Sequence, residues 1–216
     1  MYLCNVNLEQ RSKTHTIQRN RNLKQKLMRK FLLSFLLSMG IVCSAQTNHM
    51  KFKGIPIEGT LNSFILKLEQ KGYTSLGQQD GTALLKGEFA TVKGCTIGVS
   101  RFSDRDQVNM VGVIFPVDKT WNEIATRYYF LKDMLKEKYG NPECIEEFTD
   151  REPSSDFLRY HAILNGECNY ISEFSCKEGR VQLTLMKLDY DSAAVILRYI
   201  DKETSDESRK KMMDDL

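Results

Sequence analysis

Paired carboxylates in residues 146–152 are the residues that most resemble a catalytic set. Glu146 and Glu147 are adjacent, and Asp150 and Glu152 follow them. A glycoside hydrolase uses two such carboxyl groups. The surrounding stretch is predicted to be a strand, however, and adjacent residues of a strand point to opposite faces. Glu146 and Glu147 therefore cannot act jointly, and we expect a solvated strand edge and loop.

The histidines offer little catalytic chemistry. His161 lies near Asp156 and Cys168, which would suit a nucleophile set, but no motif places the three together, and a histidine on an ordinary helix face is the favoured interpretation. His49 lies close to the start of the predicted mature chain, where a frayed, solvated end is expected.

Motifs for metal or cofactor binding are also missing from the sequence. No His, Cys, Asp and Glu residues have metal-ligand spacing, and Cys168 and Cys176 would be widely separated along one strand. GxSxG, the Walker A sequence and GxGxxG in a strand-to-helix setting do not occur. We therefore predict no catalytic residue, no metal ligand and no cofactor.

Four cysteines lie in residues 46–216, namely Cys95, Cys144, Cys168 and Cys176. An even number of cysteines in an oxidising compartment favours disulfides, with three connectivities open. The alternative is free, buried thiols, because a domain of this length has a core large enough to be stable without bridges.

Strand geometry selects among these connectivities. If the strand that holds Cys144 pairs antiparallel with the strand that ends at Cys176, the two cysteines come close together. Cys168 would then be left for Cys95. Cys168 and Cys176 cannot join each other, because eight steps of about 3.3 Å separate them by roughly 26 Å. Cys144–Cys176 is the expected bridge, with Cys95–Cys168 as a second.

The stretch Met28–Gln46 has the three parts of a secretory signal peptide. Two basic residues precede Phe31–Val42, an uncharged apolar run of twelve residues, and small residues then precede a cut between Ala45 and Gln46. The run is too short for a stable membrane span, which needs about 20 apolar residues. We therefore predict that 28–45 is a signal peptide and that the protein is periplasmic or extracellular.

Other interpretations of the first 45 residues are weaker. A buried core helix can have the same length as the apolar run, but no cleavage triplet is expected after it. Lipidation of Cys43 is disfavoured because Val42, the residue before it, is not small. Residues 1–27 are basic and lack apolar periodicity, so they are interpreted as a mistranslated or disordered leader before Met28; a nucleic-acid-binding arm is the alternative.

Charge supports the exclusion of nucleic acid as a partner. The chain has 31 Lys and Arg and 28 Asp and Glu, a net charge of +3. Residues 1–30 hold eight of the basic residues and one of the acids, which leaves 23 basic and 27 acidic residues, net −4, for 46–216. A basic surface for nucleic acid is therefore not expected in the mature domain.

Residues 46–216 are predicted to form one α+β domain. Apolar residues at helical spacing follow the N-cap candidates Thr60 and Thr120, and the second helix has one apolar stripe that includes Trp121. Alternating residues and turn dipeptides predict the strands. The expected strands are 51–57, 73–78, 82–90, 95–102, 107–115, 143–149, 168–176, 181–185 and 193–200, with helices after Thr60, after Thr120, over 156–164 and over 205–216.

Two segments of the domain follow the same plan. LKLEQKGY and LKEKYG end the two long helices, and VKGCTIGVS and KEGRVQLTL each begin a strand after a glycine turn. The sequence therefore predicts an antiparallel sheet built from two helix-plus-meander (α-β-β-β) pseudo-repeats, about 51–116 and 117–201, with the helices on one face. Chance similarity through turn chemistry is the alternative.

A resemblance extends over about residues 28–216. The stretches MRKFLLSFLLSMGIVCSAQ, MKFKGIPIEGTLNSFILKLEQKGY, KGCTIGVSRF and KEKYGNPECIEEF resemble small exported proteins of unknown function from gut Bacteroidales. No activity is attached to that group, so the resemblance implies no site. The tandem plan is also similar in architecture to the beta-lactamase-inhibitor-protein-like fold and to small outer-membrane-assembly lipoproteins.

These observations favour an exported, non-catalytic module that binds a protein or a cell-envelope ligand. The alternative is a periplasmic or secreted hydrolase with an unfamiliar site, and a third class is a structural envelope component that self-associates. The direction of the charged side chains in 143–161 distinguishes the first two, because an enzyme needs them in a cleft and a binding module leaves them in water. No membrane span is expected after removal of the signal.

Overall fold

The computed structural model describes residues 48–102 and 105–214, which belong to one compact unit, Thr47–Leu216. The predicted leader 1–27, the signal peptide 28–45 and the cleavage site Ala45–Gln46 lie outside the described residues. They stay predictions.

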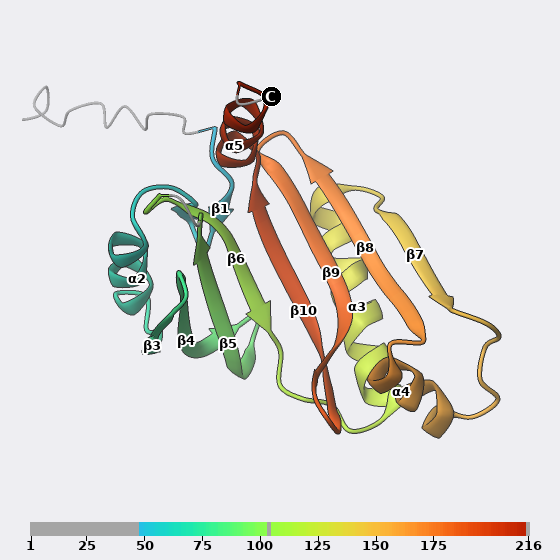
Figure 1. Ribbon diagram of the computed structural model, residues 1–216. Helices are drawn as coiled ribbons and strands as arrows, with labels where there is room; N and C mark the ends of the chain where they lie inside the picture. Colours follow the sequence, from blue (N-terminus) through green and yellow to red (C-terminus); the bar gives the residue numbers. More distant parts are fainter. Residues whose placement is uncertain (1–47, 103–104, 215–216) are drawn as a thin grey trace, which may run out of the picture. The chain divides into compact units, whose positions relative to one another are not determined.

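The domain is α+β, as predicted, and is built on one antiparallel sheet of eight strands (Figure 1). The strand order is β3-β4-β5-β6-β10-β9-β8-β7. The strands are β3 (Thr74–Gln79), β4 (Thr82–Phe89), β5 (Val92–Arg101), β6 (Val108–Ile114), β7 (Glu143–Phe148), β8 (Cys168–Cys176), β9 (Gly179–Asp189) and β10 (Ser192–Asp201).

The two halves of the sheet meet through the last strand of each half. β6 and β10 pair antiparallel in the centre, with Val111 opposite Tyr199 and Val113 opposite Leu197. Each half is a meander of four strands, in agreement with the strands expected one by one in each half, although the α-β-β-β plan names three. Because both halves end at the centre, they form one continuous sheet with one shared core.

Helices α2 (Leu61–Glu69) and α3 (Trp121–Tyr139) begin at the predicted caps. The hydroxyl oxygens of Thr60 and Thr120 each accept a hydrogen bond from the backbone N–H three residues on, at 3.3 Å in both cases. The Glu123 carboxylate accepts the backbone N–H of Lys119 at 3.0 Å, which completes the start of α3. These side chains satisfy backbone donors that a helix start leaves free.

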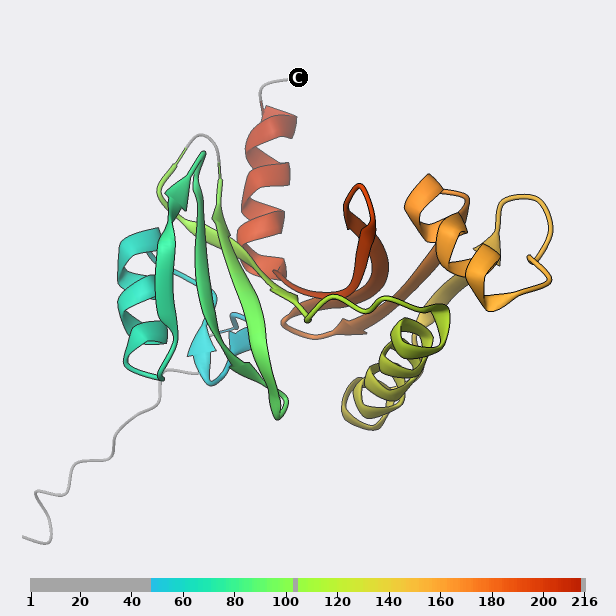
Figure 2. The same ribbon diagram turned by 90° about the horizontal axis from the view of Figure 1, so that it is seen from below.

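Helices α2 and α3 cover the same face of the sheet (Figure 2). The predicted stripe of α3 is buried at Ile124, Tyr128, Leu131 and Leu135. Trp121 is only partly buried and packs at the edge of the core, with its ring centroid 5.6 Å from Phe148 and 5.4 Å from Tyr170.

The predicted first strand, 51–57, is instead a short hairpin of β1 (Lys51–Phe52) and β2 (Ile55–Pro56). Lys53 and Gly54 turn the chain with φ of 52° and 80°. A positive φ causes little steric strain at Gly54, because glycine has no Cβ atom. The apolar side chains of Phe52, Ile55 and Ile57 are buried in the core.

Helix α4 (Asp156–Asn165) matches the prediction and packs against α3, β9 and β10. Helix α5 (Lys202–Asp214) begins three residues earlier than expected and stands on the side of the sheet opposite α2 and α3 (Figure 2). The expected anchor Met213 is 63% exposed. The side chains of Met212 and Leu216, the other expected anchors, lie outside the described residues.

Candidate functional site

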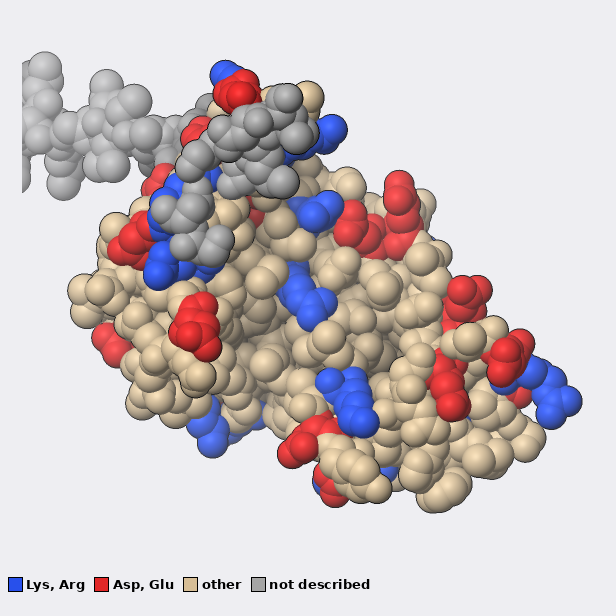
Figure 3. All heavy atoms as spheres, viewed as in Figure 1, with Lys and Arg blue, Asp and Glu red and all other residues tan. Residues whose placement is uncertain are grey.

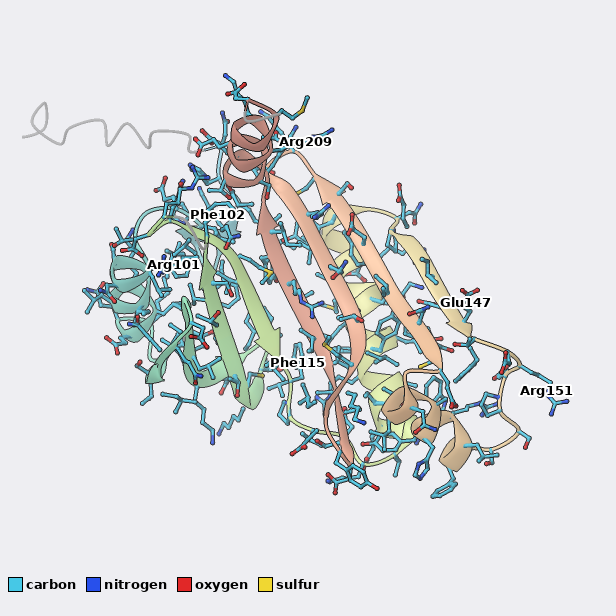
Figure 4. The ribbon with its side chains drawn as sticks, in the orientation of Figure 1. Arg101, Phe102, Phe115, Glu147, Arg151 and Arg209 are labelled. Atoms are coloured by element: carbon cyan, nitrogen blue, oxygen red, sulfur yellow. The ribbon has the colours of Figure 1, made fainter. Side chains whose placement is uncertain are left out.

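The two adjacent glutamates diverge, as strand geometry requires. Glu146 points toward α3, where its Oε1 accepts hydrogen bonds from Lys132 Nζ at 2.5 Å and from the Tyr128 hydroxyl at 3.1 Å. Glu147 points outward from the edge strand β7. Arg151 lies in the loop after this strand, and its side chain points into solvent (Figure 4). Asp150 and Glu152 are exposed, so the carboxylates of this region form no joint acid–base site.

The residues of the considered nucleophile set also have separate partners. The Asp156 carboxylate accepts from Arg159 at 2.8 Å, and the His161 ring lies against Phe157 with a centroid distance of 4.3 Å. Burial raises the pKa of the Cys168 thiol to about 11, which keeps it protonated at neutral pH. The helix-face interpretation of His161 agrees with this arrangement.

The expected disulfides are not formed, because the strand register differs from the one they need. Strands β7 and β8 do pair antiparallel, but Cys144 lies opposite Ser172, four residues before Cys176. Four residues along a strand span about 13 Å. The four cysteines are free in the structure.

The second expected bridge, Cys95–Cys168, is excluded by the strand order. Cys95 lies on β5 and Cys168 on β8, which are four strand spacings apart in the sheet. Four spacings of about 4.8 Å are about 19 Å, whereas the Cα atoms of a disulfide are usually 4.4–6.8 Å apart. The alternative of free thiols therefore describes this structure, but only Cys95 is buried, whereas Cys168 and Cys176 are partly buried and Cys144 is exposed.

His49 corrects a further expectation, because its side chain is held in place and only 14% exposed. The Nδ1 atom is 3.0 Å from Asp201 Oδ2, and the Nε2 atom lies 3.5 Å from Glu58 and 3.4 Å from Glu203. The fully buried Asp201 carboxylate also accepts the backbone N–H groups of Met50 at 2.6 Å and Thr204 at 3.0 Å. This cluster ties the start of the described chain to the junction of β10 and α5.

The His49 cluster predicts a pH dependence of stability. Burial by itself lowers the pKa of His49, but the hydrogen bond to Asp201 and the charges of Asp201, Glu203 and Glu58 raise it above 6.5 in net effect. A raised folded-state pKa gives stabilisation that is fully present below pH 6.5 and is lost as the pH rises through the folded-state pKa. Urea unfolding of wild type and His49→Gln should therefore differ most near pH 5.5 and least near pH 9. A difference that grows with pH would contradict the assignment.

The face of the sheet opposite α2 and α3 is covered by neither of these helices, and α5 stands at only one end of it (Figures 1 and 2). We call it the open face. Paired residues place its side chains in three rows that cross the sheet from β4 to β8 or β7. The rows are Lys86–Thr96–Ile114–Ile196–Thr184–Ile171–Ile145, Leu84–Gly98–Gly112–Arg198–Gln182–Glu173–Glu143 and Thr82–Ser100–Met110–Ile200–Arg180–Ser175.

The rows differ in chemistry. The first contains four isoleucines, and Ile145 at its β7 end is 51% exposed. The middle row places two glycines beside a chain of polar groups: Arg198 donates to Gln182 Oε1 at 3.1 Å, and Gln182 donates to Glu173 at 3.4 Å. Figure 3 shows mostly uncharged surface over β9 and β10, with separated basic side chains.

Arg198 lies at the centre of this face without an ion-pair partner among the described residues. Among the described residues, its guanidinium hydrogen-bonds to the neutral Gln182 oxygen and, at 3.5 Å, to the sulfur of Met186. Burial lowers the pKa of Arg198. By contrast, Arg180 in the next row lies 3.9 Å from Glu173.

Helix α5 forms a wall at one end of the open face. A hollow of about 460 Å³ lies between the helix and the ends of β8, β9 and β10. It is open to solvent, and groups of both signs line it, including Arg180, Glu173, Asp206 and Arg209. Figure 4 labels Arg209, on α5. In a deep catalytic pocket the titratable groups are enclosed, whereas those of this hollow face solvent. The hollow is therefore not a pocket of that kind.

The sequence contains one signal for this surface. Gly98 and Gly112 each interrupt an alternating strand at an interior position, and such a glycine often marks the close approach of a ligand or another backbone. The importance of Arg198 had no signal of its own, because its lack of a charged partner depends on strand register.

Neither the family models, the curated proteins nor the solved structures contain a match to this chain. Within residues 48–102 and 105–214, no helix is long and apolar enough to cross a membrane. In the same residues, no group of three or more His, Cys, Asp or Glu side chains is arranged to hold a metal ion.

Proposed function

We propose that this chain is an exported, non-catalytic module that binds a protein partner through the open face. The observation that carries the proposal is the composition of that face. A sheet covered on one side usually shows polar side chains to water on the other, whereas here a row with four isoleucines crosses the open face. Ile145 is exposed, Ile114 and Ile171 are half-buried, and Ile196 is buried. The stretch Met28–Gln46 supports export to the periplasm or the cell exterior.

The shape and chemistry of the open face favour a protein over a small molecule. The face is broad and combines half-buried apolar side chains, such as Met110 and Ile114, with one central arginine. Protein interfaces are enriched in methionine, arginine and apolar residues at their centre, with polar groups at the rim. Small-molecule sites are usually enclosed on most sides.

The charged residues of 143–161 argue for binding over hydrolysis. Glu143, Glu147, Asp150 and Arg151 are exposed, and Glu146 is engaged by Lys132 and Tyr128. Side chains that point into water cannot supply the paired groups of a hydrolase. The described residues therefore favour the binding module.

Site-specific photocrosslinking in the expressing cell tests the proposal. A photoreactive p-benzoyl-phenylalanine at Met110, on the open face, should give a discrete adduct with one other protein. The same residue at Phe130, which is 62% exposed on α3, serves as the control and should give none. Adducts from Phe130 alone, or no adduct from Met110, would refute binding through the open face. An adduct with the mass of two copies would instead support the self-associating envelope component.

A further inference from the structure

Three glycines without a positive φ, Gly87, Gly98 and Gly112, occupy interior strand positions, and one of them has a clear structural reason. A Cβ atom at Gly87 would lie 2.3 Å from Cδ1 of the buried Tyr73 ring. The position of this ring therefore requires a residue without a side chain at position 87. Gly98 and Gly112 have no such neighbour. Their added Cβ atoms would meet Leu84 Cδ2 at 3.8 Å and the Gly98 carbonyl oxygen at 3.9 Å, which are ordinary contacts.

Backbone conformation does not require glycine at these two positions either. Neither Gly98 nor Gly112 has a positive φ, so other residues could adopt the same backbone. The two glycines lie opposite each other on adjacent strands, β5 and β6, and glycine weakens a strand because it is flexible and packs nothing. The fold therefore does not require glycine at positions 98 and 112. We call the surface over the backbone of these two residues the patch.

The patch lies directly beside Arg198, because Gly112 pairs with Arg198 across β6 and β10. The Arg198 side chain is directed away from the patch, toward Gln182 and Met186, and leaves the space over the glycines free. A guanidinium has five N–H donors, and the contacts of Arg198 use two of its nitrogens. The side chain retains donors and a full positive charge for a bound group.

We propose that the patch over Gly98 and Gly112 receives a loop of the protein partner, and that Arg198 pairs with a carboxylate side chain of that loop. The charge of Arg198, which no described carboxylate balances, selects an acidic group. The bare backbone lets the partner approach closely. This inference rests on the proposed function and names the chemistry that the open face recognises.

The test measures the yield of the Met110 photoadduct in three variants. Gly112→Val fills the patch with a residue that suits a strand, and Arg198→Gln removes the charge while keeping polarity. Each should lower the adduct yield at least tenfold, while the melting temperature of Gly112→Val stays equal to or above that of wild type. Arg180→Gln is the matched control, because it removes a neighbouring charge that Glu173 already balances, and its yield should stay within twofold.

The outcomes separate the inference from the proposed function. Full adduct yield in Gly112→Val or Arg198→Gln would overturn the inference and leave binding through the open face standing. An equal loss in Arg180→Gln would show a general charge effect and would also overturn it. No adduct in wild type would remove the proposed function itself.

A defined probe tests the ligand chemistry directly. NMR titration of the purified protein with the peptide acetyl-Gly-Glu-Gly-amide should shift the amide signals of Gly98 and Gly112 in a saturable way. Acetyl-Gly-Gln-Gly-amide, or the Glu peptide with the Arg198→Gln protein, should shift them at least fivefold less. Equal shifts with both peptides, or none with either, would contradict carboxylate recognition.

Discussion

Replacing Asp201 with alanine is expected to destabilise the domain by about 3–5 kcal/mol, because it removes the acceptor for several buried donors at once. The carboxylate is fully buried and accepts from the backbone of Met50 and Thr204, from the Thr204 hydroxyl at 3.1 Å and from His49. A loss of this size is a large fraction of the 5–15 kcal/mol that typically stabilises a domain. Urea unfolding at pH 6 measures it.

Two variants control the Asp201 experiment. Glu203→Ala removes another carboxylate near His49, but that side chain is 46% exposed, so the expected loss is under about 1 kcal/mol. Asp201→Asn keeps one acceptor oxygen and should lie between wild type and alanine. If Asp201→Ala cost no more than Glu203→Ala, the tie between the start of the described chain and the β10–α5 junction would contribute little to stability.

The second large effect is expected at Gly87, where alanine should cost about 1–3 kcal/mol through overpacking. The new Cβ would collide with Tyr73, which is 5% exposed and whose hydroxyl donates to the Glu88 carbonyl at 2.9 Å. The ring cannot move aside without breaking this hydrogen bond. Guanidinium unfolding of Gly87→Ala measures the loss.

A paired experiment isolates the collision from the general effect of alanine. In a Tyr73→Leu background, Gly87→Ala should cost much less than in wild type, because the ring is gone. Gly112→Ala is the matched control at a strand-interior glycine with free space above it, and it should be neutral or stabilising. Similar losses at Gly87 and Gly112 would indicate that both glycines serve the fold.

Much of the secondary structure follows from local sequence. The cap residues Thr60 and Thr120, the apolar stripe of α3 and the alternation in β5 and β6 act over a few residues, so they could be recognised without the fold. The hairpin at Lys53–Gly54 was missed because a two-residue turn inside an apolar stretch leaves the alternation almost unchanged. Fold class and the tandem arrangement of helix and meander were likewise predictable from repeated local patterns.

Strand register could not be predicted in the same way. Alternation has a period of two, so any shift by an even number of residues keeps the same side chains on the same face. The register that places Cys144 opposite Cys176 differs by four residues from the register that places it opposite Ser172. The alternation of apolar and polar residues is compatible with both registers. The expected disulfide depended on the first register, and the structure has the second.

The sequence by itself therefore determined the elements and the class of fold, because these depend on neighbours three or four residues away in helices and two away in strands. The tertiary structure alone decided that β6 joins β10, that His49 meets Asp201, and that Arg198 lies beside Gly112 without an ion-pair partner among the described residues. These contacts join residues far apart in the chain, 152 positions for His49 and Asp201. They are selected by the packing of the whole domain, which leaves no periodic trace in the sequence.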